Sequence, residues 1–381
     1  MNEQVNQITA SNVKLIVVTG TAGRASIATM IAALLRARGQ HVAQLNGHWL
    51  HSPLEQLTVD GKPVDRDSPE ALGSTDRAAD THDIDSLLAR ALQLPGLDWL
   101  IMSGAAPHAP EAVMAVLAPV LPSACASASQ NAAQLLRDLP KTGLLVSAPQ
   151  RESVLDVLRP YSAATSNTLL EVAQRCRLAR ERSDLDGQAF RLKTGAADYR
   201  LHLSVLGTFQ VENAATAVLA VESLGGEPID PGSARAALDA VRLPGRAEVL
   251  KRRPLIIVDA GSIAGSAGGV VEILREHTAG RRLQVIVDTS EGIEPTEMVR
   301  LLTPQQPEIV VTGAPIPSGW GEACREAGLP LRSARDVASA VELAMDAAEP
   351  GEAIAVFGSR AAAAAARAQV LALLPPEMRL N

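Results

Sequence analysis

A short glycine-containing segment near the start of the chain has residue types that could bind a phosphate. The segment "GTAGRAS", Gly20 to Ser26, follows the apolar run "KLIVVT" and precedes the helical stretch "IATMIAALLRARG". In a phosphate-binding loop, backbone N–H groups at a helix N-terminus face the anion, a lysine neutralises the phosphates, and a Ser or Thr hydroxyl holds Mg²⁺. Here Arg24 stands in place of the lysine. The pattern fits an altered phosphate loop and equally a plain glycine turn.

A working phosphate loop needs more than the loop itself. An acidic residue at the end of a neighbouring strand usually holds Mg²⁺. The nearest candidate strand, "DWLIMSG", ends in Met102 and Ser103, whereas the apolar runs that end in a carboxylate, at Asp259 and Asp288, lie in the last third of the chain. Arg24 keeps the positive charge, but its planar fork is longer and bulkier than an ammonium group. We therefore assign no catalytic residue and no metal ligand.

Three other segments have residue types used in binding sites. "NGHWLH" places His48 near His51 without a nearby carboxylate or cysteine, and "DTHDID" surrounds His82 with acids. Both are interpreted as solvated loop or helix-cap residues rather than metal ligands. The run "GSIAGSAGG", Gly261 to Gly269, opens a helix after a strand, so it could bind an anion or simply pack closely. No G-x-S-x-G elbow occurs, so serine hydrolase chemistry has no support.

The first part of the chain alternates between strand and helix patterns. Strands are predicted at 14–19, 41–45, 98–104 and 143–149, and helices at 27–38, 110–117, 212–224 and 231–241. Repeated βαβ crossovers imply a mainly parallel sheet with helices on both faces. The segment "FRLKTGAADYRLHLSVLG" predicts an antiparallel hairpin that gives this sheet a mixed edge.

A Pro-Gly pair in "RLPGR" marks the predicted domain boundary. The strands "LIIVDA", "LQVIVDT", "EIVVTG" and "AIAVFG" follow it, each succeeded by a helical segment, and "RAAAAAARAQVLALL" predicts a helix that covers the sheet. This is a Rossmann-like pattern without G-x-G-x-x-G. We expect two α/β domains, residues 1–243 and 244–381.

Composition excludes several classes of protein. The 381 residues are 47% apolar but only 2% aromatic, and the net charge is -7. Few aromatic side chains and the lack of a long Lys/Arg run argue against a nucleic-acid partner. Three cysteines without a C-x-x-C pair suggest a reducing cytoplasm. The polar start and the lack of an apolar run of about 20 residues predict no signal peptide and no membrane span.

The chain resembles the folylpolyglutamate synthases, within the Mur ligase superfamily. "VVTGTAGRASIATMIAALLRARGQHVA" is similar to the start of that family and "HSPLEQLTVDGKPVD" to its SPH-loop and following strand. Four further stretches follow in the family's order: "KTGLLVSAPQRESVLDVL", "LGTFQVENAATAVLAVESL", "LPGRAEVLKRRPLIIVDAG" and "AIAVFGS". The resemblance implies an α/β fold with a Mur ligase-like P-loop domain, its sheet mixed but mainly parallel, followed by a C-terminal Rossmann-like ligase domain.

Members of the family are ADP-forming ligases. They phosphorylate a carboxylate with MgATP, and an amino acid then attacks the acyl phosphate. By position, the resemblance implies that Gln210 and Asn213 lie on the helix on the adenosine side. It also implies that Arg246 is the linker arginine and that Asp259 is the first residue of the C-domain motif. It places these residues in the phosphate loop: Gly20, Thr21, Gly23, Arg24 and Ser26.

The chain departs from the family where metal-assisted phosphoryl transfer takes place. Besides Arg24 in place of the lysine, Ala25 replaces the loop's next glycine and Leu54 replaces the SPH histidine. The strand that ends in the magnesium glutamate in the family ends here in Met102, Ser103 and Gly104. The segment with the family's carbamylated lysine is reduced to "SQNAAQLLRDLP", and the D-G-A-H-N motif reads "DAGSI". Losing both the metal and the lysine removes the charges that stabilise a transferring phosphoryl group.

Two functional hypotheses follow. The first is a pseudoenzyme that binds a protein partner or a small acidic ligand and binds ATP weakly or not at all. The second is an active, ATP-dependent acid–amino acid ligase in which another acidic residue holds Mg²⁺. The sequence favours the first hypothesis, because the losses fall on one function while the fold-forming segments are intact.

Overall fold

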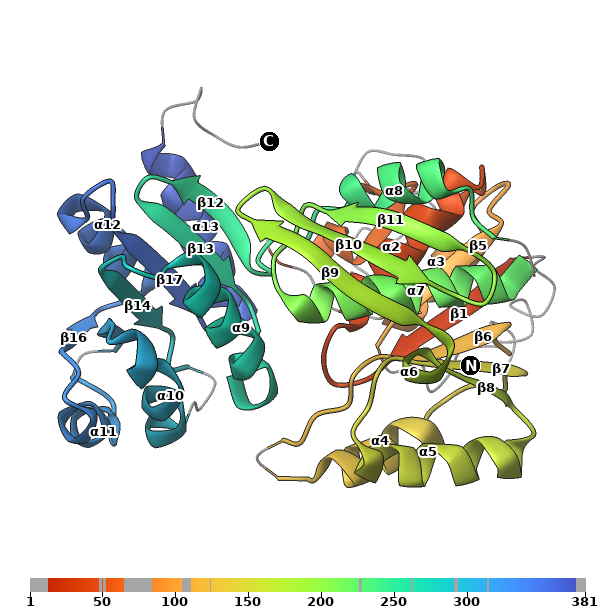
Figure 1. Ribbon diagram of the computed structural model, residues 1–381, viewed down its shortest axis with the longest axis horizontal. Coiled ribbons are helices and arrows are strands. Elements are labelled where there is room, and N and C mark those ends of the chain that lie inside the picture. The colour runs from red at the N-terminus through yellow and green to blue at the C-terminus, as the bar shows by residue number, and fades with distance from the viewer. Residues whose placement is uncertain are drawn as a thin grey trace. The chain divides into compact units, whose positions relative to one another are not determined.

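The computed structural model describes residues 13–47, 50, 53–64, 84–104, 111–123, 125–225, 228–261, 263–290, 294–313 and 315–374. His48, His51 and His82 lie outside these ranges. The chain forms two compact units (Figure 1). The first comprises Met1–Ser183, Gly187–Ser204 and Thr208–Val241, and the second comprises Asp184–Asp186, Val205–Gly207 and Arg242–Asn381.

An eight-stranded sheet forms the centre of the first unit. Its order is β4-β3-β2-β5-β1-β6-β7-β8, and every neighbouring pair from β2 to β8 is parallel, whereas β3 and β4 pair antiparallel at one edge. The predicted mixed, mainly parallel α/β sheet is therefore confirmed. The strands are β1 (Lys14–Thr19), β2 (Val42–Asn46), β3 (Leu57–Val59), β4 (Lys62–Pro63), β5 (Trp99–Ser103), β6 (Met114–Leu117), β7 (Leu144–Ser147) and β8 (Thr168–Glu171).

Helices cover both faces of this sheet. The helices are α2 (Arg24–Ala37), α3 (Ile84–Leu92), α4 (Ala128–Arg137), α5 (Glu152–Thr165), α6 (Val172–Arg175), α7 (Thr208–Gly225) and α8 (Pro231–Asp239), with a 3₁₀ turn η1 (Pro53–Gln56). One apolar cluster joins β1, β2 and β5 to α3, and another joins β6 and β7 to α4 and α5. On the opposite face α2 packs against β1, β2, β5 and α7 (Figure 1).

The helix predicted over 110–117 is wrong. Residues 114–117 form β6, a central strand whose four side chains, "MAVL", are all buried. A strand buried on both faces shows no alternation of apolar and polar residues, so its short apolar run cannot be distinguished from a buried helix by periodicity.

The predicted hairpin forms, but not at the edge of the central sheet. Strands β10 (Gly187–Lys193) and β11 (Asp198–Leu203) pair antiparallel and join β9 (Arg177–Asp184) in a separate three-stranded sheet. Inward side chains of the hairpin, among them Phe190, Tyr199 and Leu201, are buried. They cover α7, which is itself buried along most of its length, so the prediction of a mixed edge made by this hairpin is corrected.

A buried carboxylate ties the hairpin to α7. Glu222 is 6% exposed and accepts hydrogen bonds from the Tyr199 hydroxyl at 2.6 Å and from Thr194 Oγ1 at 3.0 Å. The Tyr199 oxygen in turn accepts from the Ile229 backbone N–H at 3.1 Å. Burial, followed by the hydrogen bond to Glu222, raises the pKa of Tyr199 well above its usual value. This network fixes three segments of the first unit with one side chain.

The second unit contains a six-stranded sheet of order β12-β13-β17-β14-β15-β16. Only β12 runs antiparallel to its neighbour. The strands are β12 (Glu248–Arg252), β13 (Leu255–Asp259), β14 (Leu283–Val287), β15 (Glu308–Thr312), β16 (Leu331–Ala334) and β17 (Ala353–Phe357). The helices are α9 (Ile263–His277), α10 (Pro295–Leu302), α11 (Trp320–Ala327), α12 (Val337–Ala347) and α13 (Arg360–Leu373), with a 3₁₀ turn η2 (Thr303–Gln305).

Asp288, directly after β14, is buried beneath hydroxyl groups. Its carboxylate accepts hydrogen bonds from Ser290 Oγ at 2.6 Å, Ser359 Oγ at 2.7 Å and Thr312 Oγ1 at 3.2 Å. Burial raises the pKa of Asp288, but the hydrogen bonds from Ser290 and Ser359 together outweigh burial, so the pKa lies below the usual 3.8. The ionised carboxylate therefore stabilises the link between β14, β15 and the start of α13.

We expect Asp288→Asn to weaken the acid dependence of stability. Because the folded pKa of Asp288 is depressed, its contribution is present above the unfolded pKa and is lost as pH falls through the folded value. Urea unfolding at pH 7 and below pH 4 measures this. The wild type should lose more unfolding free energy on acidification than Asp288→Asn does, while Asp346→Asn on the exposed side of α12 should follow the wild type. Equal acid dependence in all three proteins would contradict the assignment.

Candidate functional site: the Gly20–Ser26 loop

The loop lies between β1 and α2, and its backbone is attached to the segment after β6. The N–H groups of Thr21 and Ala22 both donate to the Pro119 carbonyl at 3.1 Å. Thr21 Oγ1 also donates to this carbonyl at 3.3 Å and accepts from the Leu121 N–H at 2.6 Å. A side chain at Gly20 would meet the Ala118 carbonyl oxygen at 2.8 Å. The first half of the loop is therefore held by the protein itself, with Thr21 as an anchor.

The second half of the loop opens α2. Gly23 is the N-cap residue, with φ 72° in the left-handed region, and no acidic side chain lies in the first turn. The Ile27 N–H donates to the Gly23 carbonyl, whereas the amides of the first turn have no acceptor within the helix. These N–H groups and the helix dipole favour an anion at this end, where Arg24 begins the helix and Ser26 is buried.

Two predicted residues on α7 lie beside the loop. Asn213 and Gln210 are each 1% exposed, and Asn213 Nδ2 donates to Gln210 Oε1 at 3.0 Å. Asn213 Oδ1 is buried without a hydrogen-bond partner among the described residues. A Cβ built on Gly23 would lie 2.7 Å from that oxygen. The structure thus brings Gly23, Gln210 and Asn213 together and leaves a buried acceptor next to the loop.

The neighbouring strand ends have neutral polar side chains. Ser103, at the end of β5, donates to Asn46 Oδ1 at the end of β2 at 2.8 Å. Gln44 Nε2 donates to the same oxygen at 2.9 Å and to Thr29 Oγ1 on α2 at 3.0 Å. Met102 instead packs in the apolar cluster with Leu45 and Leu57. We name the four residues Thr29, Gln44, Asn46 and Ser103 the amide–hydroxyl network.

This network does not fit a magnesium site. Mg²⁺ is usually held through one or two carboxylates, and none of the four side chains of the network is a carboxylate. In the part of the chain that the structure describes, no group of three or more His, Cys, Asp or Glu residues is placed to hold a metal ion. We derive no step through a metal at this loop.

Arg246 and Asp259 belong to the second unit. Asp259, at the end of β13, is buried and accepts hydrogen bonds from the N–H groups of Ala247 at 2.8 Å and Gly261 at 2.6 Å. Burial raises its pKa, although Arg246 and the two amides act in the opposite direction. Arg246 donates to the Ala260 carbonyl at 2.9 Å. Both side chains hold the turn before β12 against the end of β13.

The sequence alone pointed to neither the amide–hydroxyl network nor the Pro119 anchor. The four network residues come from α2, β2 and β5, and single Asn, Gln and Ser residues in a sequence give no signal for mutual hydrogen bonding. The only local signal is polarity at the strand ends, in "QLNG" and "MSG".

Three features define the fold of this chain as that of the folylpolyglutamate synthases, a Mur ligase-type fold. They are a glycine loop between the first strand and helix of a mainly parallel sheet, a separate three-stranded sheet, and a second α/β unit. The structure of the Mycobacterium tuberculosis folylpolyglutamate synthase complexed with ADP and AMPPCP superposes with a TM-score of 0.79 at 22% identity, covering 97% of this chain and 95% of that one. The Yersinia pestis bifunctional folylpolyglutamate synthase/dihydrofolate synthase, complexed with AMPPNP and a Mn ion, gives 0.77 at 19% identity over 97% and 93% of the two chains.

Sequence relatives agree with the fold. The dihydrofolate synthase/folylpolyglutamate synthase of Mycobacterium tuberculosis is 24% identical over 338 residues, 77% of this chain and 69% of that protein. A probable bifunctional folylpolyglutamate synthase/dihydropteroate synthase of Haloferax volcanii is 25% identical over 392 residues, 93% of this chain but only 46% of that protein. The resemblance to the folylpolyglutamate synthases is confirmed. No family model matches the chain.

No helix among the described residues is both long enough and apolar enough to cross a membrane.

Proposed function

We propose that this protein is a folylpolyglutamate synthase-like pseudoenzyme that binds a phosphate-bearing ligand at the Gly20–Ser26 loop without forming an amide bond. The observation that carries the proposal is the amide–hydroxyl network, which puts neutral groups where phosphoryl transfer needs a carboxylate for Mg²⁺. Arg24 in place of the loop lysine supports it. Metal and lysine stabilise the charge on the transferring phosphoryl group, so losing both lowers the rate by many orders of magnitude.

Anion binding requires neither the lysine nor the metal. The first-turn amides of α2 and the Arg24 cation supply the attraction for a phosphate beside Gly20, Gly23 and Ser26. On the adenosine side, Asn213 Oδ1 is an acceptor without a partner among the described residues, and it is suited to an amino group. We propose these residues, with Gln210, as the site of weakly bound ATP.

The remaining assignments extend the proposal. Residues 1–243 act as the P-loop ATPase-like domain and residues 244–381 as the Rossmann-like domain retained from a ligase. The binding partner is a protein or a small acidic ligand in the cytoplasm, rather than a nucleic acid or a membrane. The net charge of -7 and the low aromatic content support this choice.

We expect no ADP above background when the protein is incubated with MgATP, folates or muropeptide-like acids, and candidate amino acids. The physical reason is the missing metal carboxylate, so Arg24→Lys alone should not restore turnover either. A coupled ADP-release assay measures both, with the Mycobacterium tuberculosis relative as the positive control. Calorimetry with an ATP analogue in the same buffer checks whether the nucleotide binds.

Each outcome separates the two hypotheses. Analogue binding without ADP release supports the pseudoenzyme. Robust ADP release by the wild type would instead establish an active ligase in which another acidic residue has taken over the metal. Turnover by Arg24→Lys alone would show that the magnesium ligand lies outside the strand ends described above.

A further inference from the structure

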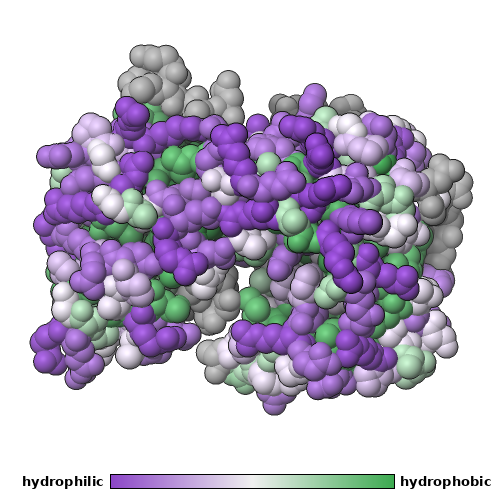
Figure 2. Space-filling view, viewed as in Figure 1, coloured by the Kyte–Doolittle hydropathy of each residue, from purple (hydrophilic) through white to green (hydrophobic). Residues whose placement is uncertain are grey.

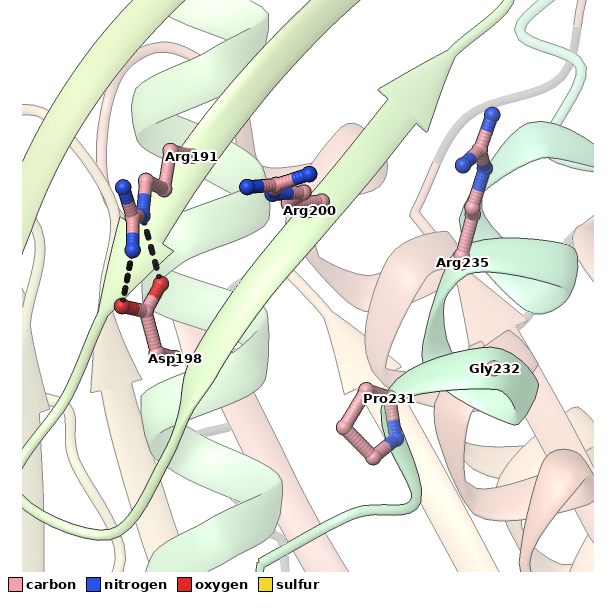
Figure 3. A pocket seen from close by; sticks show the side chains of 6 residues that line it. All are labelled: Arg191, Asp198, Arg200, Pro231, Gly232 and Arg235. Atoms are coloured by element: carbon pink, nitrogen blue, oxygen red, sulfur yellow. Dashed lines mark hydrogen bonds and ion pairs between the residues drawn. The ribbon is translucent and has the colours of Figure 1, made fainter.

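A cationic depression lies on the first unit between the hairpin and α8 (Figure 3). It is a shallow, open depression of about 480 Å³, lined by Arg191, Asp198, Arg200, Pro231, Gly232 and Arg235. Three arginines thus face one carboxylate on a chain whose net charge is -7. Hydrophilic residues cover most of this side of the three-stranded sheet (Figure 2). The local charge is opposite in sign to that of the protein as a whole.

Asp198, the single carboxylate of the lining, already forms an ion pair with Arg191. Arg191 Nε donates to Asp198 Oδ1 at 2.8 Å and its Nη2 to Oδ2 at 2.6 Å, a bidentate pair that holds this arginine in place. In the antiparallel register Arg191 lies directly opposite Arg200. Like charges at directly opposed positions destabilise a sheet. The hydrogen bond from Arg191 and, less strongly, the charge of Arg200 lower the pKa of Asp198, so this carboxylate offsets part of the repulsion.

Two guanidinium groups are left for a ligand. Neither Arg200 nor Arg235 makes a hydrogen bond or ion pair with any residue that the structure describes, and Arg200 lies between the Arg191–Asp198 pair and Arg235 (Figure 3). The N-terminus of α8 beside them is capped internally, because Asp230 accepts the Ser233 N–H at 2.7 Å. The arginines, rather than the helix end, must supply the binding energy.

We propose that this depression binds a small polyanion, a molecule with at least two phosphate or carboxylate groups. One oxyanion group binds Arg200 and another binds Arg235, while the charge of Arg191 is balanced by Asp198. The planar fork of arginine matches carboxylate and phosphate oxygens in pairs, and the open depression has room for a small molecule. The site goes beyond the proposed function, since none of its residues belongs to the Gly20–Ser26 loop.

Calorimetry of the full chain with two probes tests this. Inorganic pyrophosphate represents phosphates and tricarballylate represents carboxylates, both at low salt. We expect at least one probe to bind the wild type and Arg200→Gln/Arg235→Gln to raise its Kd about a hundredfold, roughly tenfold for each charged hydrogen-bonding partner. Asp198→Asn frees Arg191 and removes a negative charge, so it should lower Kd. Arg325→Gln in the second unit is the matched control.

Arg24→Ala separates this site from the loop. Probe binding that survives Arg24→Ala but not the double substitution supports the proposal, even if the loop proves unable to bind ATP. Probe binding lost only with Arg24→Ala, or unchanged in the double variant, would overturn it. So would failure of both small probes while polyglutamate binds, because that result indicates a protein partner. Thermal unfolding confirms that each variant is folded.

Discussion

Gly23→Ala should weaken binding of an ATP analogue at least about tenfold, whereas Gly39→Ala should leave it unchanged. The two glycines stand at opposite ends of α2 with almost the same left-handed φ, 72° and 77°. A methyl group at Gly39 would meet nothing within 4 Å, but at Gly23 it would lie 2.7 Å from Asn213 Oδ1. Both substitutions carry the backbone strain of about 1–2 kcal/mol. Only Gly23→Ala also displaces the loop or Asn213, so calorimetry should show a loss of at least about tenfold in affinity for that variant alone.

A double substitution identifies the cause. In Gly23→Ala/Asn213→Ala the added methyl group no longer meets the amide oxygen, so some stability lost in Gly23→Ala should return. A urea-unfolding cycle over the four proteins measures this coupling. Equal loss of analogue affinity in Gly23→Ala and Gly39→Ala would show that helix strain, rather than the contact with α7, controls the loop.

Glu222→Leu should destabilise the first unit by about 1–3 kcal/mol. The substitution leaves the buried Tyr199 hydroxyl without its acceptor, whereas Thr194 Oγ1 can still donate to the Ala197 carbonyl at 3.3 Å. Glu222→Gln keeps an acceptor oxygen and should lose much less. Urea unfolding followed by circular dichroism provides the measurement. Exposed Glu326→Leu is the control for the gain of an apolar residue.

The result would also test the role of the network. If Glu222→Leu were as stable as Glu222→Gln, the hydrogen bonds of this carboxylate would contribute nothing that an apolar side chain cannot replace. The three-stranded sheet would then be held to α7 by its buried apolar residues alone.

Local patterns predicted most of the fold. The loop and α2 follow from a β-rich run, glycines and a helical repeat, all within one segment. The strands of the second unit follow from apolar runs such as "LIIVD" and "LQVIV". The sequence does not predict β6, because a buried run of four residues shows no periodicity. It also does not predict which sheet the hairpin joins, because the residues of one strand do not specify a partner strand far away in the sequence.

The candidate site was less predictable than the fold. Gly23 and Asn213 could be matched to family motifs, yet their contact depends on the packing of α2 against α7. The lack of a carboxylate at this strand end is visible in the sequence "MSG". The hydrogen-bonded network in its place could not be predicted, because it depends on the positions of Gln44, Asn46 and Ser103 on two paired strands. Hydrogen bonds between side chains far apart in sequence become visible only in three dimensions.

In the pseudoenzyme that we propose, the amide–hydroxyl network also opposes the return of a metal-binding carboxylate. Asn46 Oδ1 accepts from both Gln44 and Ser103, so a carboxylate introduced at position 103 would set two acceptors against each other. Relieving that repulsion turns the Asn46 amide and breaks its bond to Gln44, which also supports Thr29. A carboxylate at position 103 is therefore accommodated only after the Asn46 and Gln44 amides have both turned. Such epistasis makes the return of a metal ligand depend on a rearrangement of the whole network.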